Sequence, residues 1–183
     1  MMTPFSSVAF EYHPLRDSSF TEISRAGLIW HHLMDLYASQ YDLSIRTALD
    51  LGTGFGHIVT VGSQRFGIDV IGMDLRRAVY QGPAERFVEH DIMTPWPFAS
   101  GRFDLVLECL LFDDLVGLQK KQKQDVTSHL SSEIDRVVRK RGYFFSHSSS
   151  SRDLILPSFE LLADDRSFRL YQKRSLKKSN FGE

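Results

Sequence analysis

Residues 48–56 read Ala48-Leu49-Asp50-Leu51-Gly52-Thr53-Gly54-Phe55-Gly56, an apolar run that passes directly into three glycines at alternate positions. Such a run is typical of a buried strand that turns sharply into a helix. The turn needs residues that tolerate unusual backbone angles, and a ligand lying over it needs main chain without side chains in its way. The stretch therefore predicts a strand, a turn and a helix with a ligand against the glycines. The alternative is a tight turn that binds nothing.

An acidic residue, Asp74, follows the glycine turn by about twenty residues, at the end of the next predicted strand. A carboxylate at this place in an α/β sheet can accept hydrogen bonds from both hydroxyls of an adenosine ribose. The competing interpretation is a helix N-cap, because aspartate at a strand end often caps the following helix. The glycine turn favours the nucleoside interpretation.

The glycine spacing also separates two kinds of nucleoside cofactor. Dinucleotide enzymes have the pattern G-x-G-x-x-G, whereas the third glycine here comes one position early and His57 occupies the later position. A nicotinamide-dependent oxidoreductase is therefore the weakest of the functions considered. No G-K-S or G-K-T sequence of a P-loop is present either.

Short apolar runs alternate with helical stretches along most of the chain, as in a parallel sheet with crossover helices. The strands are predicted at residues 47–51, 70–74, 86–90, 103–108, 143–146 and 168–174. The helices are predicted near residues 21–39, 57–65, 75–81, 118–140 and 153–163. The sequence thus predicts an α/β fold, a Rossmann-like three-layer sandwich with a mostly parallel sheet of about six strands.

Length and composition restrict the organisation and the partners. The 183 residues fit one domain, with an irregular arm over 1–18, a helix over 19–40, a ligand-binding core over 47–147 and a polar tail over 175–183. The net charge of -1 shows no surplus of basic residues, so neither nucleic acid nor a membrane is an expected partner. The single cysteine, Cys109, cannot form an internal disulfide, which favours a cytoplasmic location.

Further segments complete a family pattern, in the order Gly72-Met73-Asp74-Leu75, Glu89-His90-Asp91-Ile92, Pro97-Phe98, Phe103-Asp104-Leu105-Val106 and Glu133-Ile134-Asp135-Arg136-Val137-Val138-Arg139-Lys140-Arg141-Gly142. With the glycine turn, these segments resemble the class I S-adenosylmethionine-dependent methyltransferases, and among them the small-molecule, type 11-like group. The resemblance implies that the chain uses S-adenosylmethionine, releases S-adenosylhomocysteine and methylates a small molecule by in-line displacement.

The resemblance also implies which residues bind the cofactor, position by position. The set is Asp50, Gly52, Thr53, Gly54, Gly56, Asp74, Leu75, Asp91, Ile92 and Glu108. Asp50 and the glycine-turn backbone would hold the methionine part, and Asp74 the ribose. Leu75 and Ile92 would pack against the adenine, and Asp91 would accept a hydrogen bond from its amine. Glu108 and Cys109 would lie near the sulfonium, the alternative being that Glu108 caps a loop and Cys109 fills the core.

The candidate catalytic base is His147, because it follows the fifth predicted strand at the ligand-binding end of the sheet and an imidazole titrates near neutrality. The alternative is a loop histidine without a role. No metal site is predicted, since the adjacent His31 and His32 point to different helix faces.

The sequence departs from the family in ways that affect the substrate side. Arg141 replaces the proline or glycine that usually precedes Gly142. After the fifth strand one helix and one strand are predicted, where the family ends with an antiparallel pair. A reduced substrate-side cap, or one completed by a second copy of the chain, is therefore expected. These departures motivate a second hypothesis, a non-catalytic or repurposed S-adenosylmethionine-binding protein of the same fold. The acceptor is not identified.

Overall fold

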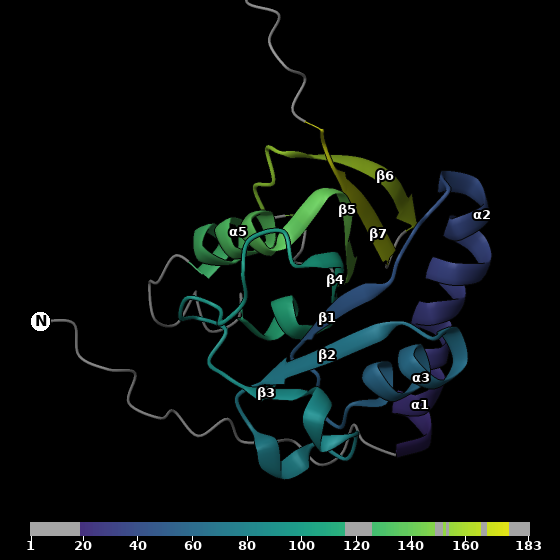
Figure 1. Cartoon of the computed structure of the whole chain (residues 1–183), viewed down its shortest axis with the longest axis vertical. Coiled ribbons are helices and arrows are strands. Elements are labelled where there is room, and N and C mark those ends of the chain that lie inside the picture. The colour runs from purple at the N-terminus through teal and green to yellow at the C-terminus, as the bar shows by residue number, and fades with distance from the viewer. Residues whose placement is uncertain (1–18, 116–125, 149–151, 153, 166–167, 176–183) are drawn as a thin grey trace, which may run out of the picture.

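The core of the protein is a seven-stranded mixed sheet in the order β3-β2-β1-β4-β5-β7-β6 (Figure 1). The computed structural model describes residues 19–115, 126–148, 152, 154–165 and 168–175. The strands are β1 (Thr47–Leu51), β2 (Asp69–Asp74), β3 (Phe87–Glu89), β4 (Phe103–Cys109), β5 (Val138–His147), β6 (Phe159–Asp165) and β7 (Phe168–Lys173). Strands β1 to β5 are parallel, and β7 pairs antiparallel with both β5 and β6.

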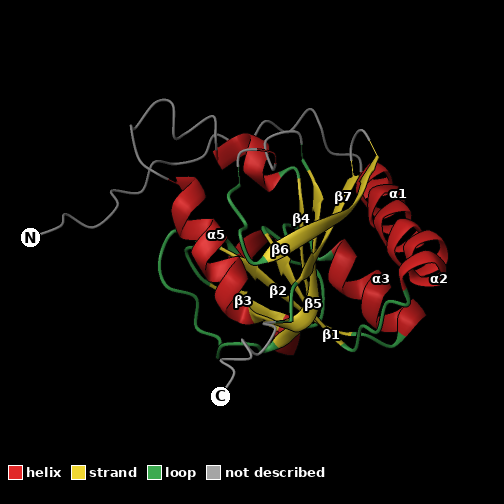
Figure 2. Cartoon of the chain, turned by 90° about the horizontal axis from the view of Figure 1, so that it is seen from above, coloured by secondary structure: helices red, strands yellow, loops and turns green. Residues whose placement is uncertain are grey.

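Helices cover both faces of this sheet and complete three layers. They are α1 (Ser19–Trp30), the π-helical segment η2 (His31–Tyr37), α2 (Ala38–Tyr41), α3 (His57–Phe66) and α5 (Val126–Val137), with a further helical stretch at 111–115. Seen from above, α1, α2 and α3 lie on one side of the sheet and α5 on the other (Figure 2). The three-layer sandwich expected from the sequence is confirmed.

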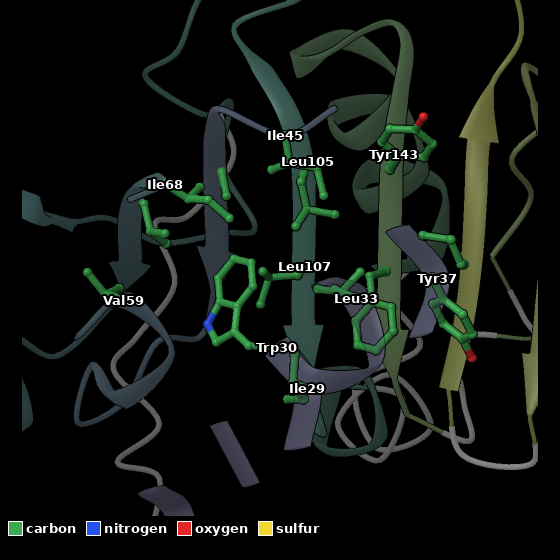
Figure 3. Packing of buried hydrophobic residues seen from close by; sticks show 14 of the residues in the cluster. Ile29, Trp30, Leu33, Tyr37, Ile45, Val59, Ile68, Leu105, Leu107 and Tyr143 are labelled. Carbon is green, nitrogen blue, oxygen red and sulfur yellow. The ribbon is translucent and has the colours of Figure 1, made fainter. Parts of the chain in front are cut away.

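The α1 layer is fixed to the sheet by aromatic and aliphatic side chains. Trp30 and Leu33 are fully buried over the sheet beside Leu107 (Figure 3). The indole Nε1 of Trp30 donates to the carbonyl oxygen of Ile58 at 2.9 Å, which ties α1 to the first turn of α3. A Cβ added to Gly62 would lie 2.4 Å from the Trp30 ring, so the two helices meet at a residue without a side chain.

The opposite layer packs through α5 and anchors the loop between β3 and β4. Leu130 and Ile134 are buried against the sheet in a second apolar cluster. Glu133 Oε2 accepts hydrogen bonds from the backbone nitrogen of Trp96 at 2.7 Å and from Arg136 at 2.6 Å, and Arg136 also donates to the carbonyl of Phe98. The loop that leaves β3 is thereby held against α5.

The start of β5 differs from the sequence prediction. The sequence predicts a helix over 118–140, because basic residues and then Gly142 follow it, as is typical of a helix C-terminus. The described part of that helix, α5, ends at Val137 and β5 begins at Val138, while residues 116–125 lie outside the described residues. Gly142 lies inside β5, where a Cβ would meet the carbonyl oxygen of Asp104 at 2.9 Å. The residue before this glycine, Arg141, is the one that adopts the left-handed backbone conformation, with φ of 64°. Close strand contact, rather than a helix end, therefore explains this glycine.

The helix predicted over 153–163 is wrong, because β6 occupies 159–165 and residues 154–158 are not helical. Strand β6 pairs with β7 from Phe159 opposite Lys173 to Asp165 opposite Phe168. Pairing with β7 supplies hydrogen-bond partners for the backbone of this edge segment. Its apolar residues alone also fit a helical period, which is why the local sequence predicts a helix. The terminal antiparallel pair is thus present, and the sheet has seven strands. The predicted arm (1–18) and most of the predicted tail (175–183) lie outside the described residues.

The predicted helix near 75–81 is reduced to a short 3-10 turn, Arg77–Val79. Within the described part of the chain, none of the helices has the length and apolar character needed to cross a membrane.

Candidate functional site

The candidate site lies at the carboxyl ends of β1 and β4, where the strand order reverses. From β1 the chain proceeds outward to β2 and β3, and β4 then returns to the other side of β1 before β5. In open parallel sheets the crevice at such a switch point is the place where ligands bind. The glycine turn follows β1 directly, so it lies at this crevice.

The three glycines of the turn all have left-handed backbone angles, with φ of 66° at Gly52, 52° at Gly54 and 82° at Gly56. Their surroundings differ. A Cβ on Gly52 would meet Leu111 Cδ1 at 2.9 Å, and one on Gly56 would meet the Tyr80 ring at 2.3 Å. A Cβ on Gly54 would meet only the carbonyl oxygen of Gly52, at 4.0 Å. Gly54 is therefore the glycine whose backbone faces open space.

The carboxylate of Asp74 is held beside this turn. Its Oδ2 accepts a hydrogen bond from the backbone nitrogen of Gly54 at 3.0 Å, and its Oδ1 accepts one from the backbone nitrogen of Arg76 at 3.0 Å. The second contact is local to the turn after β2, and Asp74 does not cap the 3-10 segment, whose N-cap is Arg76 without a side-chain cap. The first contact places the carboxylate at the edge of the glycine turn. The next residue, Leu75, is an apolar side chain that is 58% exposed.

The carboxyl of Asp50 is buried beneath the turn. It is 1% exposed, and Oδ2 accepts a hydrogen bond from the Thr53 hydroxyl at 2.6 Å. Burial raises the pKa of Asp50 to about 7, the hydroxyl of Thr53 opposes this shift, and the charge of Asp74 adds to it. A cationic group placed nearby would favour the ionised form.

A second buried carboxyl, Glu108, lies near the end of β4. The hydroxyl of Ser146 on the neighbouring strand β5 donates to its Oε1. Burial raises the pKa of Glu108 to about 8, although hydrogen bonds from Ser146 and from backbone N–H groups oppose the shift. The side chain is fully buried, so it lies under the site rather than on its surface.

Cys109 and His147 are paired across β4 and β5. The Sγ of Cys109 lies 3.2 Å from Nδ1 of His147, and burial raises the thiol pKa to about 12. The pKa of His147 is lowered by burial and then by the charge of Arg25. Its ring stacks on Phe168 of β7 with centroids 4.5 Å apart. The antiparallel pair that the sequence analysis placed in doubt therefore supplies one wall around the candidate base.

An open pocket of about 440 Å³, a volume that includes its mouth, lies over the glycine turn. Its lining is Arg25, Ala26, Asp50, Gly52, Thr53, Gly54, His57, Ile58 and Cys109. Four members of the predicted cofactor-binding set are thus brought together. Arg25 and Ala26 of α1 are additions that sequence reasoning missed, because no motif or spacing relates the first helix to the turn.

The other members of the predicted set lie outside this lining. Asp91 Oδ1 accepts a hydrogen bond from the backbone nitrogen of Met93 at 2.9 Å. The carbonyl of Ile92 accepts one from Trp96 Nε1 at 2.9 Å and is 3.1 Å from Nε2 of His129. This loop is thus fixed from the α5 side, and the adenine contacts proposed for it stay predictions. Among the described residues, no three His, Cys, Asp or Glu side chains are grouped so that they could hold a metal ion.

Comparison with known proteins assigns the family. A family model described as a methyltransferase domain, the type 11 group, matches residues 49–146, from the middle of β1 to the end of β5. The chain belongs to this methyltransferase family. The match covers more than half of the 183 residues and confirms the resemblance to class I methyltransferases. A search of the curated proteins finds no match.

Solved structures share the fold of this methyltransferase. An S-adenosyl-L-methionine-dependent methyltransferase, as it is described, from Methanococcus maripaludis aligns with a TM-score of 0.58 and 13% identity, covering 88% of this chain and 93% of that one. Geranyl diphosphate C-methyltransferase from Streptomyces coelicolor was solved with S-adenosyl-L-homocysteine. It aligns with a TM-score of 0.50 and 17% identity, covering 72% of this chain and 47% of that one. Haemonchus contortus phosphoethanolamine N-methyltransferase 2, solved with S-adenosyl-L-methionine, aligns with a TM-score of 0.50 and 20% identity. The alignment covers 67% of this chain and 27% of that one. The chain thus spans half or less of the latter two.

Proposed function

We propose that this methyltransferase uses S-adenosylmethionine to methylate a small-molecule acceptor, and that the described residues act as one domain. When bound, the cofactor supplies a methyl group on a positively charged sulfur, which is already reactive toward nucleophiles. The protein then has to align the acceptor, exclude water and move a proton. The observation that carries the proposal is the bare backbone of Gly54, facing a pocket at the switch point with Asp74 fixed beside it.

The residues around the turn fit the two ends of this cofactor. The buried carboxyl of Asp50 and the open backbone at Gly54 suit the polar methionine end, and the charge of a sulfonium would favour ionised Asp50. Asp74 still has lone pairs for ribose hydroxyls after accepting its two backbone hydrogen bonds. Leu75, exposed beside it, offers an apolar surface for an adenine ring.

For proton removal we assign His147. The lowered pKa keeps its imidazole neutral at pH 7, the form that accepts a proton. In the tautomer whose Nδ1–H donates to Cys109 Sγ, the Nε2 lone pair is available to an acceptor hydroxyl, amine or thiol. We expect His147→Ala to slow methyl transfer by 10²-fold or more while leaving cofactor affinity within threefold of wild type, measured by turnover and calorimetry.

Calorimetric titration with S-adenosylhomocysteine tests the cofactor site. We expect Asp74→Ala to weaken binding about 100-fold, because charge-assisted hydrogen bonds to two ribose hydroxyls are removed. Glu160→Ala, which removes an exposed acid on β6, should bind like wild type. Unchanged affinity in Asp74→Ala would count against the assignment, and Asp74→Asn, which keeps an acceptor for Gly54, controls for damage to the turn.

Methyl transfer is tested with labelled S-adenosylmethionine and a broad panel of small-molecule acceptors. Sustained incorporation of label with a multiple-turnover time course supports the enzyme. Tight binding of S-adenosylhomocysteine without transfer to any acceptor would favour the alternative, a non-catalytic binding protein of the same fold. NAD serves as the negative control in the binding experiment, because the glycine spacing disfavours it.

A further inference from the structure

Two histidines that are far apart in the sequence share one aromatic neighbour. The ring of Phe168, the first residue of β7, stacks on His147 of β5 with centroids 4.5 Å apart and lies against His32 of η2 with centroids 4.2 Å apart. The ring planes differ by 26° and 34°, so both contacts are closer to stacking than to an edge-to-face arrangement. Phe168 is buried, and it therefore holds the two imidazoles no farther apart than these two distances together.

His32 is oriented by the π-helical segment to which it belongs. Its Nδ1 lies 3.0 Å from the carbonyl oxygen of Leu28, four residues earlier. Because a carbonyl oxygen only accepts, Nδ1 carries a proton, and Nε2 is the nitrogen that takes up the second proton when the ring becomes charged. The preceding residue, His31, lies nearer the solvent, with Nδ1 2.8 Å from Asp35 Oδ2 and 49% of its side chain exposed. Of this adjacent pair, His32 is thus the histidine that packs against β7.

Charged and titratable groups from four elements act on His147. They are Arg25 of α1, Asp113 of the helical stretch 111–115, His32 of η2 and the thiol of Cys109 of β4. Burial is the main reason that the pKa of His147 is lowered; the charge of Arg25 lowers it further, Asp113 opposes this, and His32 adds to the lowering. The Cys109 thiol, with a pKa of about 12, carries no charge at pH 7. An arginine stays charged in this pH range whereas an imidazole gains and loses its charge near neutrality, so His32 provides a charge that varies with pH.

We propose that His32 is a positioning residue for methyl transfer, which packs with Phe168 to hold the imidazole of His147 in place and, when protonated, opposes protonation of that base. This inference rests on the proposed function, in which His147 removes a proton from the acceptor. It assigns a role to two residues, His32 and Phe168, that lie outside the stretch matched by the family model, residues 49–146. Removal of the charge on His32 should make His147 more basic, so the pH below which the base is blocked should rise.

Titration of the histidines by NMR tests the effect of the charge without an acceptor. The His147 signal is assigned from its loss in His147→Gln. We expect His32→Phe, which keeps a flat ring against Phe168 but removes the charge, to raise the measured pKa of His147 by about 0.5 unit. His32→Gln removes the same charge with a different side chain and should give a rise of the same size. His31→Phe is the matched control, because it removes an adjacent imidazole that is paired with Asp35, and it should shift the pKa of His147 by less than about 0.2 unit.

Turnover measurements test both parts of the role, with an acceptor found in the labelled-donor panel. The acid limb of the kcat/KM profile should move to higher pH in His32→Phe by the same amount as the pKa of His147. At pH 8.5, where His147 is neutral, His32→Ala should turn over about tenfold more slowly than wild type, because the ring that packs on Phe168 is missing. His32→Phe should restore most of that loss, since it returns a ring to the same place.

The outcomes separate this inference from the proposed function. An unchanged pKa of His147 in His32→Phe or in His32→Gln would overturn the inference and leave the proposed function intact. A rise of equal size in His31→Phe would also overturn it, by showing a general effect of net charge. Wild-type turnover in His147→Gln would instead overturn the base assignment of the proposed function, and the inference with it.

Discussion

Burial disfavours the charged forms of three ionisable groups around the pocket. The pKa is raised to about 7 for Asp50, to about 8 for Glu108 and to about 12 for Cys109. In each case loss of hydration disfavours the charged form more than neighbouring donors or cations favour it. At pH 7 Glu108 and Cys109 are therefore mainly protonated and Asp50 is about half protonated, and a cationic ligand would draw protons off the two carboxyls as it binds.

The burial of the Cys109 thiol can be measured directly by alkylation, because Cys109 is the only cysteine in the sequence. At pH 8 a rise in pKa from 9 to about 12 lowers the thiolate fraction about 10³-fold. We expect iodoacetamide to alkylate the native protein at least 100-fold more slowly than the urea-unfolded chain, followed by mass spectrometry. Equal rates in the two states would show that the thiol is not desolvated.

Chain order predicts which of the candidate site residues lie together, whereas their binding of the cofactor stays a prediction. Asp50, Gly52, Thr53 and Gly54 are consecutive or nearly so, and the backbone turn alone brings them to one pocket. Arg25 could not be found in this way, because its place depends on how α1 packs against α3. Gly56 has the left-handed backbone that the spacing predicts, and the Tyr80 ring is a second reason for a glycine there, because it occupies the position of a Cβ.

At the scale of elements, the crossing of α1 and α3 decides the geometry of the site. Both helices contribute pocket residues, and they meet where Gly62 faces Trp30. Any side chain at this crossing would separate the helix that carries Arg25 from the one that begins at the glycine turn. Packing at Gly62 therefore sets the distance between two helices that line the pocket.

We expect Gly62→Ala to lower the free energy of unfolding by about 1 to 3 kcal/mol, because the new methyl group overlaps the buried Trp30 ring. Urea unfolding followed by tryptophan fluorescence measures this. The control is Gly27→Ala on α1, whose added Cβ meets nothing within 4 Å and which should be neutral or stabilising by up to about 1 kcal/mol. A stability for Gly62→Ala equal to or above wild type would disprove the close crossing.

The parallel strands could be predicted because each combines an apolar run with a following turn or helix signal. The end of the chain could not. Four of the five residues in 159–163 are apolar and can be accommodated in a helical pattern, but pairing with β7 along the edge of the sheet makes them a strand. Likewise β5 begins directly after α5, because Val138 pairs with Phe103 before the bulge that precedes Leu105. Both errors concern long-range pairing, which local periodicity does not contain.

For the whole molecule, the buried carboxyls make stability depend on pH. Glu108 in the folded protein keeps its proton up to about pH 8, whereas in the unfolded chain it ionises near pH 4.3. The folded state therefore binds more protons in this window, and the free energy of unfolding falls as pH rises. His57 and His147, whose pKa values are lowered, act in the opposite direction, but only below about pH 6.5, where the unfolded histidines are charged.

Between pH 6.5 and 8 we expect the native protonation of Glu108 to make wild-type stability fall by on the order of 1 kcal/mol per pH unit, and Asp50 to contribute less, because it loses its native proton near pH 7. Glu108→Gln should show a shallower fall, because its amide oxygen can still accept from Ser146 while the proton linkage is gone. Urea unfolding at pH 6.5, 7.2 and 8.0 gives both slopes. Parallel slopes for the two proteins would mean that Glu108 is ionised in the native state.

The two edge strands of the sheet affect how copies of the chain associate in solution. One edge is β3, only three residues long, and the other is β6, which carries Glu160, Asp164 and Asp165. A short ladder is a weak template for an incoming strand, and an acidic one repels its own duplicate. Growth of a continuous intermolecular sheet is therefore disfavoured at either edge, and at the β6 edge this protection against aggregation comes from the antiparallel hairpin whose Phe168 stacks on His147.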